Sequence, residues 1–513
     1  MIKLRQIVDN VYERQQNGKG LPGSFMAWLR IIIISGRRQT TIINVLAAVL
    51  LPFSTAIAGD RHDYAVMVDA ELRQLTVLAR FGVAVSDISA RSGTARQFLI
   101  EANDCDTGKR IQIRGRRMLP IDSGVRCLKY SVDLEQAARA ERRNESLHDS
   151  NIVISPAVWM WRPPLGADDE IRVRFDLPGD VGVSVPWQRV DSSANTYLLT
   201  ASPRSGFAML AFGRFETFVA HVADDELAIT LLRSTADVAA APIIEWIRDT
   251  ANILVLAYGR FPNPNARVLV FPVEGDPGRG ESAVHFGRVV RDGGETVELL
   301  IDPGQPIEMF YEDWAATHEF AHLMLPYVDS EQRWISEGFA QYYQNLLLAR
   351  AGRYTQQYAW QKLHDGLARG RESVPGLSPN EAASREERNS RMKIYWSGAA
   401  LALMADVELR RRSNGVETLD VVLDQFQRCC LPSRRSWSGL ELFAKFDSFL
   451  DEPLFLDLYQ RYADTAGFPD TAPLLKRLGV VLDGAEIQLS DDAELAEILA
   501  MLTARRYTGR PDR

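Results

Sequence analysis

Histidine and cysteine are scarce in this chain of 513 residues, which contains seven histidines and four cysteines. The spacing of the cysteines fits no zinc-finger pattern. No Gly-x-Ser-x-Gly segment is present, so the sequence offers no nucleophile elbow for a serine hydrolase. An apolar run at residues 42–53 is short for a membrane span, which needs about 20 residues.

Positive charge is also in the minority, with 59 Lys and Arg against 67 Asp and Glu. Residues 1–58 are basic, with seven Lys or Arg and two Asp or Glu. Their removal would change the net charge from −8 to about −13. Such acidity argues against nucleic acid as a partner.

Two of the seven histidines fall within one pentapeptide, His318-Glu319-Phe320-Ala321-His322. Residues four apart lie on one face of a helix, so both imidazoles can reach one ion. Glu319 follows the first histidine, where its carboxylate can accept a proton from a zinc-activated water. Glu337 follows fifteen positions after the second histidine and offers a third ligand. The sequence therefore predicts one zinc ion per chain, held by His318, His322 and Glu337.

The neighbouring sequence favours two helices joined by a short turn. Apolar residues recur at near-helical spacing from Ile307 to Leu325, and Pro326 ends that helix. A second helix is predicted from about Glu331 to Leu348, which would bring its glutamate back to the histidines. The alternative interpretation is a helix whose two histidines merely cap a core face.

At these residues the sequence resembles the gluzincins, zinc peptidases whose third ligand is a glutamate on the following helix. The glycyl aminopeptidase family is the most similar, and the aminopeptidase N family is a more distant relative. Trp334-Ile335-Ser336-Glu337-Gly338-Phe339, followed by Tyr342-Tyr343, resembles the third-ligand segment of the former. Ile394 to Leu401 is similar to the Tyr-x-Lys-Gly-Ala segment of both families. The likeness extends from Ala236 to Phe449.

The resemblance implies a role for Tyr395, the tyrosine of the second segment. In such enzymes this tyrosine donates a hydrogen bond to the oxyanion, an effect worth roughly 3–4 kcal/mol for one donor. The alternative is that Tyr395 simply begins an amphipathic helix with Leu401 and Leu403 beneath it. Glu319 would act as general base and later return the proton to the departing amine.

Three features depart from these families. Fourteen residues separate His322 from Glu337, a short gap for the family, and Ser397 stands in place of the usual lysine. The segment that helps hold a substrate's amino group in these families has a weak counterpart at residues 281–287, where only His285 echoes the pattern. Possible partners behind the zinc ligands are the carboxylates of Asp313, Asp406 and Glu408.

The first 58 residues are predicted to be a signal peptide. Arg37-Arg38 precede the apolar run, and Ala56-Ile57-Ala58 makes a cleavage site of small residues. Cleavage near Ala58 would give a periplasmic or secreted protein without a stable membrane span; the alternative is a retained N-terminal membrane anchor. In an oxidising compartment Cys105 and Cys127 could form a disulfide, whereas Cys429-Cys430 are either free or a vicinal pair.

The chain is long enough for several domains of an α+β protein. We expect a signal peptide at 1–58, a mostly-β domain at 59–235, a thermolysin-like zinc peptidase domain at 236–450, with a small antiparallel sheet plus helices, and a helical region at 451–513. Helices are predicted at Tyr64–Phe81, Pro242–Tyr258 and Leu454–Arg506; strands at Ile171–Phe175, Val181–Val185, Val268–Val273, Ala283–Val290 and Thr296–Ile301; and a charged surface loop at Gly370–Lys393.

These observations lead to one function hypothesis. The chain is expected to be an exported zinc metallopeptidase, aminopeptidase-like, that acts on a peptide or protein substrate. Two alternatives stay open: an envelope endopeptidase, and a catalytically inactive peptidase-fold binding protein. The intact Glu319 argues against the second, because a fold kept only for structure has no reason to hold a base beside the metal.

Overall fold

The computed structural model describes residues 60–505, except 120–123, 141–150, 167, 192–194, 202–207, 233–238, 274–281 and 386–387. All of them belong to one compact unit, Ala58–Arg513. The predicted signal peptide at 1–58 lies outside the described residues. Throughout the described ranges, no helix is both long enough and apolar enough to cross a membrane.

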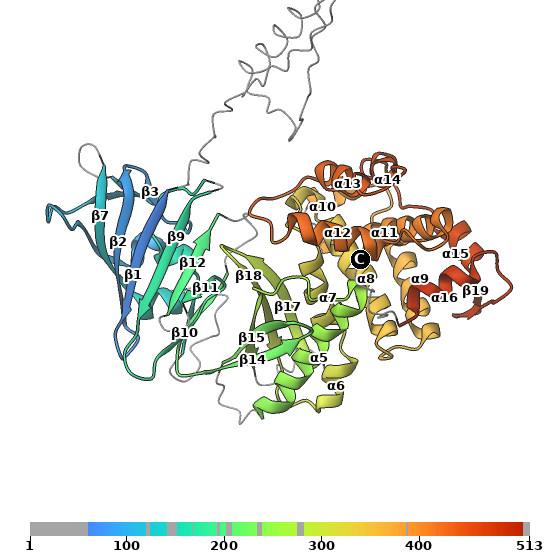
Figure 1. Cartoon of the computed structure of the whole chain (residues 1–513), viewed down its shortest axis with the longest axis horizontal. Coiled ribbons are helices and arrows are strands. Elements are labelled where there is room, and N and C mark those ends of the chain that lie inside the picture. The colour runs from blue at the N-terminus through green and yellow to red at the C-terminus, as the bar shows by residue number, and fades with distance from the viewer. Residues whose placement is uncertain are drawn as a thin grey trace, which may run out of the picture. The chain divides into compact units, whose positions relative to one another are not determined.

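The first part of this unit is rich in β-structure (Figure 1). Its largest sheet has seven strands in the order β11-β12-β9-β1-β2-β7-β4, antiparallel except for the β1–β9 pair. Two three-stranded sheets, β10-β13-β8 and β3-β6-β5, accompany it. The elements are β1 (Arg61–Val68), β2 (Gln74–Val85), β3 (Ile88–Ser89), α2 (Ala95–Phe98), β4 (Leu99–Asp104), β5 (Gln112–Arg114), β6 (Arg117–Leu119), β7 (Val125–Asp133), α3 (Leu134–Ala140), β8 (Ile152–Ile154), α4 (Pro156–Trp159), β9 (Glu170–Asp176), β10 (Gly182–Ser184), β11 (Gln188–Asp191), β12 (Thr196–Thr200) and β13 (Leu210–Gly213).

The helix predicted at Tyr64–Phe81 is wrong, because that segment forms most of strands β1 and β2. Alternate residues of both strands are buried, which is the period of a strand with one face on a core. The side chain of Asp69 accepts hydrogen bonds from the N–H groups of Arg73 and Gln74 and so stabilises the turn between them. The strands predicted at Ile171–Phe175 and Val181–Val185 are confirmed as β9 and β10.

A five-stranded sheet follows, in the order β14-β15-β16-β18-β17. The three strands predicted from 268 to 301 are confirmed, and Asp292 to Gly294 turn the chain between the last two. The sheet is mixed rather than antiparallel, because β15–β16 and β16–β18 are parallel pairs. Its strands are β14 (Glu216–Val222), β15 (Asp225–Leu231), β16 (Arg267–Pro272), β17 (Val284–Arg291) and β18 (Glu295–Ile301).

Helices cover one face of this sheet and make up most of the rest of the chain (Figure 1). One core cluster extends from Val268 and Leu299 of the sheet to Leu502 near the C-terminus. The elements are α5 (Ala240–Tyr258), α6 (Ile307–Glu312), α7 (Ala315–Ala321), η1 (His322–Met324), η2 (Ser330–Gln332), α8 (Trp334–Arg350), α9 (Gln356–Glu372), α10 (Pro379–Ser384), η3 (Arg388–Ser390), α11 (Arg391–Ser413), α12 (Leu419–Cys430), α13 (Gly439–Asp447), α14 (Phe455–Tyr462), α15 (Ala472–Leu478), β19 (Val480–Asp483), β20 (Glu486–Leu489) and α16 (Ala496–Thr503).

Two predictions for this part need correction. The surface loop expected at Gly370–Lys393 contains helix α10, which begins with a capping box between Ser378 and Glu381. The helical region expected at Leu454–Arg506 also contains a hairpin, β19–β20. The α5 helix confirms the prediction at Pro242–Tyr258.

The cysteines form two disulfides. Cys105 is bonded to Cys127, as the sequence suggested, and the adjacent Cys429 and Cys430 are bonded to each other.

Candidate metal centre and active site

The two histidines lie at the end of a short helix. The helix predicted from Ile307 to Leu325 is interrupted, because the side chain of Asp313 accepts a hydrogen bond from the N–H of Ala315 at 2.7 Å and starts a new helix there. His318 lies inside this helix, α7, and His322 is its C-cap residue. Their rings meet edge to face, with centroids 4.9 Å apart.

Glu337 enters the same space from the first turn of α8. One of its oxygens, Oε2, lies 3.3 Å from Nε2 of His318 and 3.4 Å from Nε2 of His322. Two ligands about 2.0–2.1 Å from a tetrahedral zinc ion would lie about 3.4 Å apart. The three donors therefore have both the chemistry and the spacing of a zinc site. Among the described residues they are the group of acidic, His or Cys side chains that could hold a metal ion.

The charges of the three groups are coupled. Burial alone would raise the pKa of Glu337, but the charge of His322 and the hydrogen bonds from both histidines hold it well below its usual range. Burial would lower the pKa of His322, but the carboxylate of Glu337 raises it. The carboxylate thus favours a positive charge between these side chains, and a bound cation would supply that charge.

Glu319 lies beside the donors, half-buried against the edge of the sheet. Burial raises the pKa of its carboxyl group, opposed by the charges of His322 and His318. Strand β17 approaches very closely: a Cβ atom added to Gly287 would lie 2.5 Å from Cγ of Glu319. Any larger residue at this position of the strand would force the side chain of Glu319 to shift.

Tyr395 reaches the site from α11. Its ring stacks on that of His318, with centroids 5.6 Å apart and an interplanar angle of 20°. Burial, together with the negative charges of Glu337 and Glu319, raises the pKa of the phenol. The hydroxyl group therefore keeps its proton and can donate a hydrogen bond. Leu401 and Leu403 are buried on the same helix, so Tyr395 also belongs to a helix that packs these leucines into the core, as the alternative interpretation predicts.

Two glycines allow α8 and α11 to cross at close range. A Cβ atom added to Gly338 would lie 2.2 Å from Cα of Gly398, and one added to Gly398 would lie 2.0 Å from the carbonyl oxygen of Trp334. Each glycine is near a candidate functional residue, Glu337 or Tyr395. The close crossing brings these two side chains into one site.

Sequence reasoning did not find the side chain behind His318. Oε1 of Gln344 lies 3.3 Å from Nδ1 of that histidine, and the amide oxygen can only accept. With its proton on Nδ1, His318 would donate to this oxygen, and Nε2 would be left free to bind a metal. Gln344 is seven residues after Glu337, two turns along the same face of α8, and that spacing was the available signal.

The three carboxylates predicted for this role lie elsewhere. Asp313 accepts hydrogen bonds from the N–H of Ala315 and from the hydroxyl group of Ser282. Asp406 bonds to Tyr342 and Arg410, and Glu408 pairs with an arginine at the protein surface.

Comparison with known proteins gives a match to a family model over part of the chain and a shared fold. Residues 326–401, which include Glu337 and Tyr395, match the model of the M61 glycyl aminopeptidase family. A search of curated protein sequences finds no match. Among solved structures, an aminopeptidase N family protein from Idiomarina loihiensis has a TM-score of 0.59 at 14% identity, covering 82% of this chain and 78% of that one. An M1 zinc metallopeptidase from Deinococcus radiodurans has a TM-score of 0.45 at 16% identity, covering 80% and 94%.

The first of these structures shows that the α+β fold predicted here, with a β-rich N-terminal part and a helical C-terminal part, is shared with aminopeptidase N family proteins. The match over residues 326–401 supports a zinc metallopeptidase that resembles the M61 glycyl aminopeptidases, and the fold is shared with an aminopeptidase N family protein.

Proposed function

We propose that the chain is an exported, aminopeptidase-like enzyme that hydrolyses peptide bonds at the site formed by α7, α8 and α11. His318, His322 and Glu337 are the proposed ligands of one zinc ion. The observation that carries the proposal is the convergence of one Glu337 oxygen on both imidazoles, at 3.3 and 3.4 Å. A zinc ion bound there would supply a Lewis acid that activates water and polarises the scissile carbonyl.

Glu319 is the proposed general base. It lies next to a proposed ligand in sequence, so its carboxylate can take a proton from a water held at the site. The raised pKa of the carboxyl group suits a base that must also return the proton to the departing amine. A backbone hydrogen bond from Val289 lowers the pKa of this carboxyl group, against the larger effect of burial.

Tyr395 is the proposed donor to the oxyanion that develops on the carbonyl oxygen. Its phenol is protonated at neutral pH, and its ring is held against His318. A donor that is already oriented costs little reorganisation when charge develops.

The edge of the sheet offers a place for the peptide main chain. Strand β17 is the last of its sheet, pairing on one side with β18 and on the other with no strand of the described chain. An extended peptide could add to this edge through backbone hydrogen bonds. Because Gly287 of this strand touches Glu319, a peptide docked here would pass the general base.

The decisive experiment combines metal analysis with cleavage of a peptide library. The purified chain without residues 1–58 should hold one zinc ion and release N-terminal residues from peptides with a free amino group. Peptides with a blocked N-terminus should resist. Cleavage of blocked peptides at internal bonds would replace the aminopeptidase proposal with an endopeptidase, and a chain that binds no zinc would overturn the metallopeptidase assignment.

A Glu319→Gln variant separates an enzyme from a binding protein. The amide keeps the size of the side chain but cannot act as a base, so turnover should fall by roughly 10²–10⁴-fold. Zinc content should stay the same, because Glu319 is not a proposed ligand. A binding protein of the same fold would have no turnover to lose.

A further inference from the structure

The second proposed ligand sits where its helix ends. Helix α7 stops at Ala321, and the chain continues as the 3-10 helix η1. In a continuing α-helix the carbonyl of His322 would accept the N–H four residues later, but that residue is Pro326, which has none. Within the chain segment itself, this carbonyl accepts a 3.3 Å hydrogen bond from the N–H of Leu325. The end of the helix therefore needs a donor from elsewhere.

Arg291, the last residue of β17, provides that donor. Its Nη2 atom donates to the carbonyl of His322 at 2.9 Å and to the carbonyl of Leu325 at 2.9 Å. Only 8% of the arginine side chain is exposed, so these bonds are shielded from competing water. One side chain thus satisfies two carbonyl groups at the end of the metal helix.

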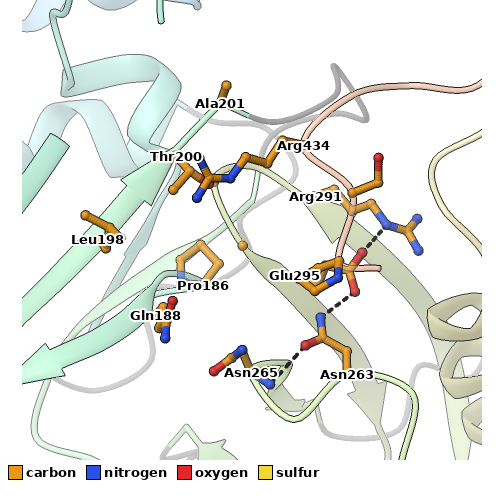
Figure 2. Close-up of a pocket in the computed structure, with 14 residues that line it drawn as sticks. Pro186, Gln188, Leu198, Thr200, Ala201, Asn263, Asn265, Arg291, Glu295 and Arg434 are labelled. Atoms are coloured by element: carbon orange, nitrogen blue, oxygen red, sulfur yellow. Dashed lines mark hydrogen bonds and ion pairs between the residues drawn. The ribbon is translucent and has the colours of Figure 1, made fainter. Parts of the chain in front are cut away.

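The guanidinium group is itself fixed by two further residues (Figure 2). Glu295, opposite Arg291 across the hairpin, forms an ion pair with its Nε. The other oxygen of Glu295 accepts a hydrogen bond from Asn263 at 2.6 Å. The buried carboxylate balances the buried cation and holds it in one orientation.

The hairpin turn that carries this pair is anchored in the β-rich region. Asp292 forms an ion pair with Arg91. Its carbonyl accepts a hydrogen bond from Nε1 of Trp187 at 3.0 Å. The backbone next to Arg291 is therefore attached to the β-rich region, and this attachment limits the movement of the arginine.

We propose that Arg291 is a positioning residue for the metal site, which holds His322 in place through its backbone carbonyl. The proposal rests on the zinc site of the proposed function. A metal ligand must be held within about 0.5 Å of its productive position, and residues behind the ligands provide that restraint. His322 has the greater need of it, because the regular helix no longer restrains its carbonyl.

The test compares two Arg–Glu pairs that each join strand β17 to strand β18. In the Arg291→Met/Glu295→Gln variant both charges are removed together, so neither is left buried alone. We expect zinc to leave this variant at least about tenfold faster than the unmodified protein when a chelator is added. The matched control is Arg288→Met/Glu298→Gln, which removes the neighbouring pair. Arg288 points to the other face of the sheet, so its loss should leave the zinc release rate within about twofold of the original.

A conservative variant makes the test independent of folding problems. Arg291→Lys keeps the charge beside Glu295, but its single nitrogen cannot serve the carboxylate and both carbonyls as the guanidinium does. Its zinc release rate should lie between those of the unmodified protein and the double variant. The proposal would be overturned if both Arg291→Lys and the Arg291→Met/Glu295→Gln variant released zinc at the rate of the unmodified protein. It would also be overturned if the Arg288→Met/Glu298→Gln control released zinc as fast as the double variant.

A second measurement needs no metal. In the zinc-free proteins, the backbone amides of residues 315–328 should exchange hydrogen faster in the Arg291→Met/Glu295→Gln variant than in the control. The Arg291→Lys variant should show a smaller increase over the same residues. Unchanged exchange there would refute the positioning role. If the unmodified protein binds no zinc, the metallopeptidase proposal fails, while this exchange experiment still decides whether Arg291 holds the end of α7.

Discussion

Tyr395 is positioned before any substrate arrives. Its ring lies on His318, and burial, together with the nearby carboxylates, raises the pKa of its phenol and keeps it protonated. The Tyr395→Phe variant should preserve the stacked ring but remove the hydroxyl donor. We predict that kcat falls by roughly 10²–10³-fold while KM and zinc content change little, because the lost hydrogen bond forms mainly in the transition state.

Steady-state kinetics with a free-N-terminal peptide checks this prediction. An equal loss in zinc content would mean that the tyrosine supports the metal site instead. Unchanged kcat would assign Tyr395 to packing alone.

Gln344 gives a second prediction at the same scale, because it is the side chain that sets the protonated nitrogen of His318. The Gln344→Leu variant keeps the volume and the burial but loses the acceptor. Zinc affinity should fall by about 10–100-fold in a chelator competition assay.

Gln341→Leu is the matched control, since Gln341 is a buried glutamine one turn earlier on α8. Its substitution should leave zinc affinity within about twofold of the original. A similar loss of affinity in both variants would indicate a general effect on the helix and not the proposed contact.

At the scale of elements, the close crossing of α8 and α11 is the feature on which the site depends. The Gly398→Ala variant would place a methyl group against the carbonyl of Trp334, a backbone atom that cannot rotate away. The helices must then separate, at a cost of about 1–3 kcal/mol in stability. Activity should fall as well, because the separation moves Tyr395 away from Glu337.

Urea denaturation and kinetics on the same preparation test both effects. Gly376→Ala is a suitable control, because an added Cβ atom there meets nothing within 4 Å. If Gly398→Ala were as stable and active as this control, the glycine contact would not set the helix spacing.

Some of these helices and strands could be predicted from the sequence and others could not. Helix α5 and strands β16 to β18 have clear periodicity, and all were predicted close to their observed bounds. The sequence predicts one helix where β1 and β2 lie, because the turn between them is rich in helix-forming residues, but the alternate burial along both segments is that of strands. Helix α10 was missed although its capping box, Ser378 to Glu381, is a local signal.

Part of the candidate site could likewise be predicted from the sequence, and part could not. The geometry of His318, His322 and Glu337 follows from local spacing and from one short turn, so the sequence brought them together. Gln344 and Arg291 contact the proposed ligands His318 and His322 from 26 and 31 residues away in the sequence. These contacts depend on how separate elements pack, which the spacing of residues does not determine.

At the scale of the whole molecule, a buried network of charges joins helix α8, which carries Glu337, to the C-terminal region. Arg350 of α8 pairs with Asp420 of α12 and donates to the carbonyl of Leu502 in α16. Arg410 of α11 pairs with Asp406 and also with Asp420. The network contains equal numbers of cations and anions and ties four helices together, so the C-terminal helix and the helix that carries Glu337 are expected to unfold in one step.

Asp420 lies between both arginines, and its removal should weaken the whole unit. Burial would raise the pKa of its carboxyl group, but the charges of Arg350 and Arg410 lower the pKa below its usual value. A carboxyl group with a lowered pKa contributes stability above its unfolded pKa of about 3.9 and loses it as the pH falls through the folded value. The Asp420→Asn variant leaves two buried arginines with one carboxylate, so it should lose about 3–5 kcal/mol in free energy of unfolding at pH 7.

Urea denaturation from pH 7 down to pH 3 tests the origin of that loss. The difference between the two proteins should stay constant down to about pH 5 and shrink below about pH 4, because the carboxyl group of Asp420 then takes up a proton in the unfolded state of the original protein. Glu494→Gln, which removes a surface partner of Arg477, should cost no more than about 1 kcal/mol at any of these pH values. If the difference in free energy of unfolding does not change with pH, Asp420 stabilises the fold through its hydrogen bonds and packing and not through its charge. If Asp420→Asn loses no more stability than Glu494→Gln, the network does not hold the helices together.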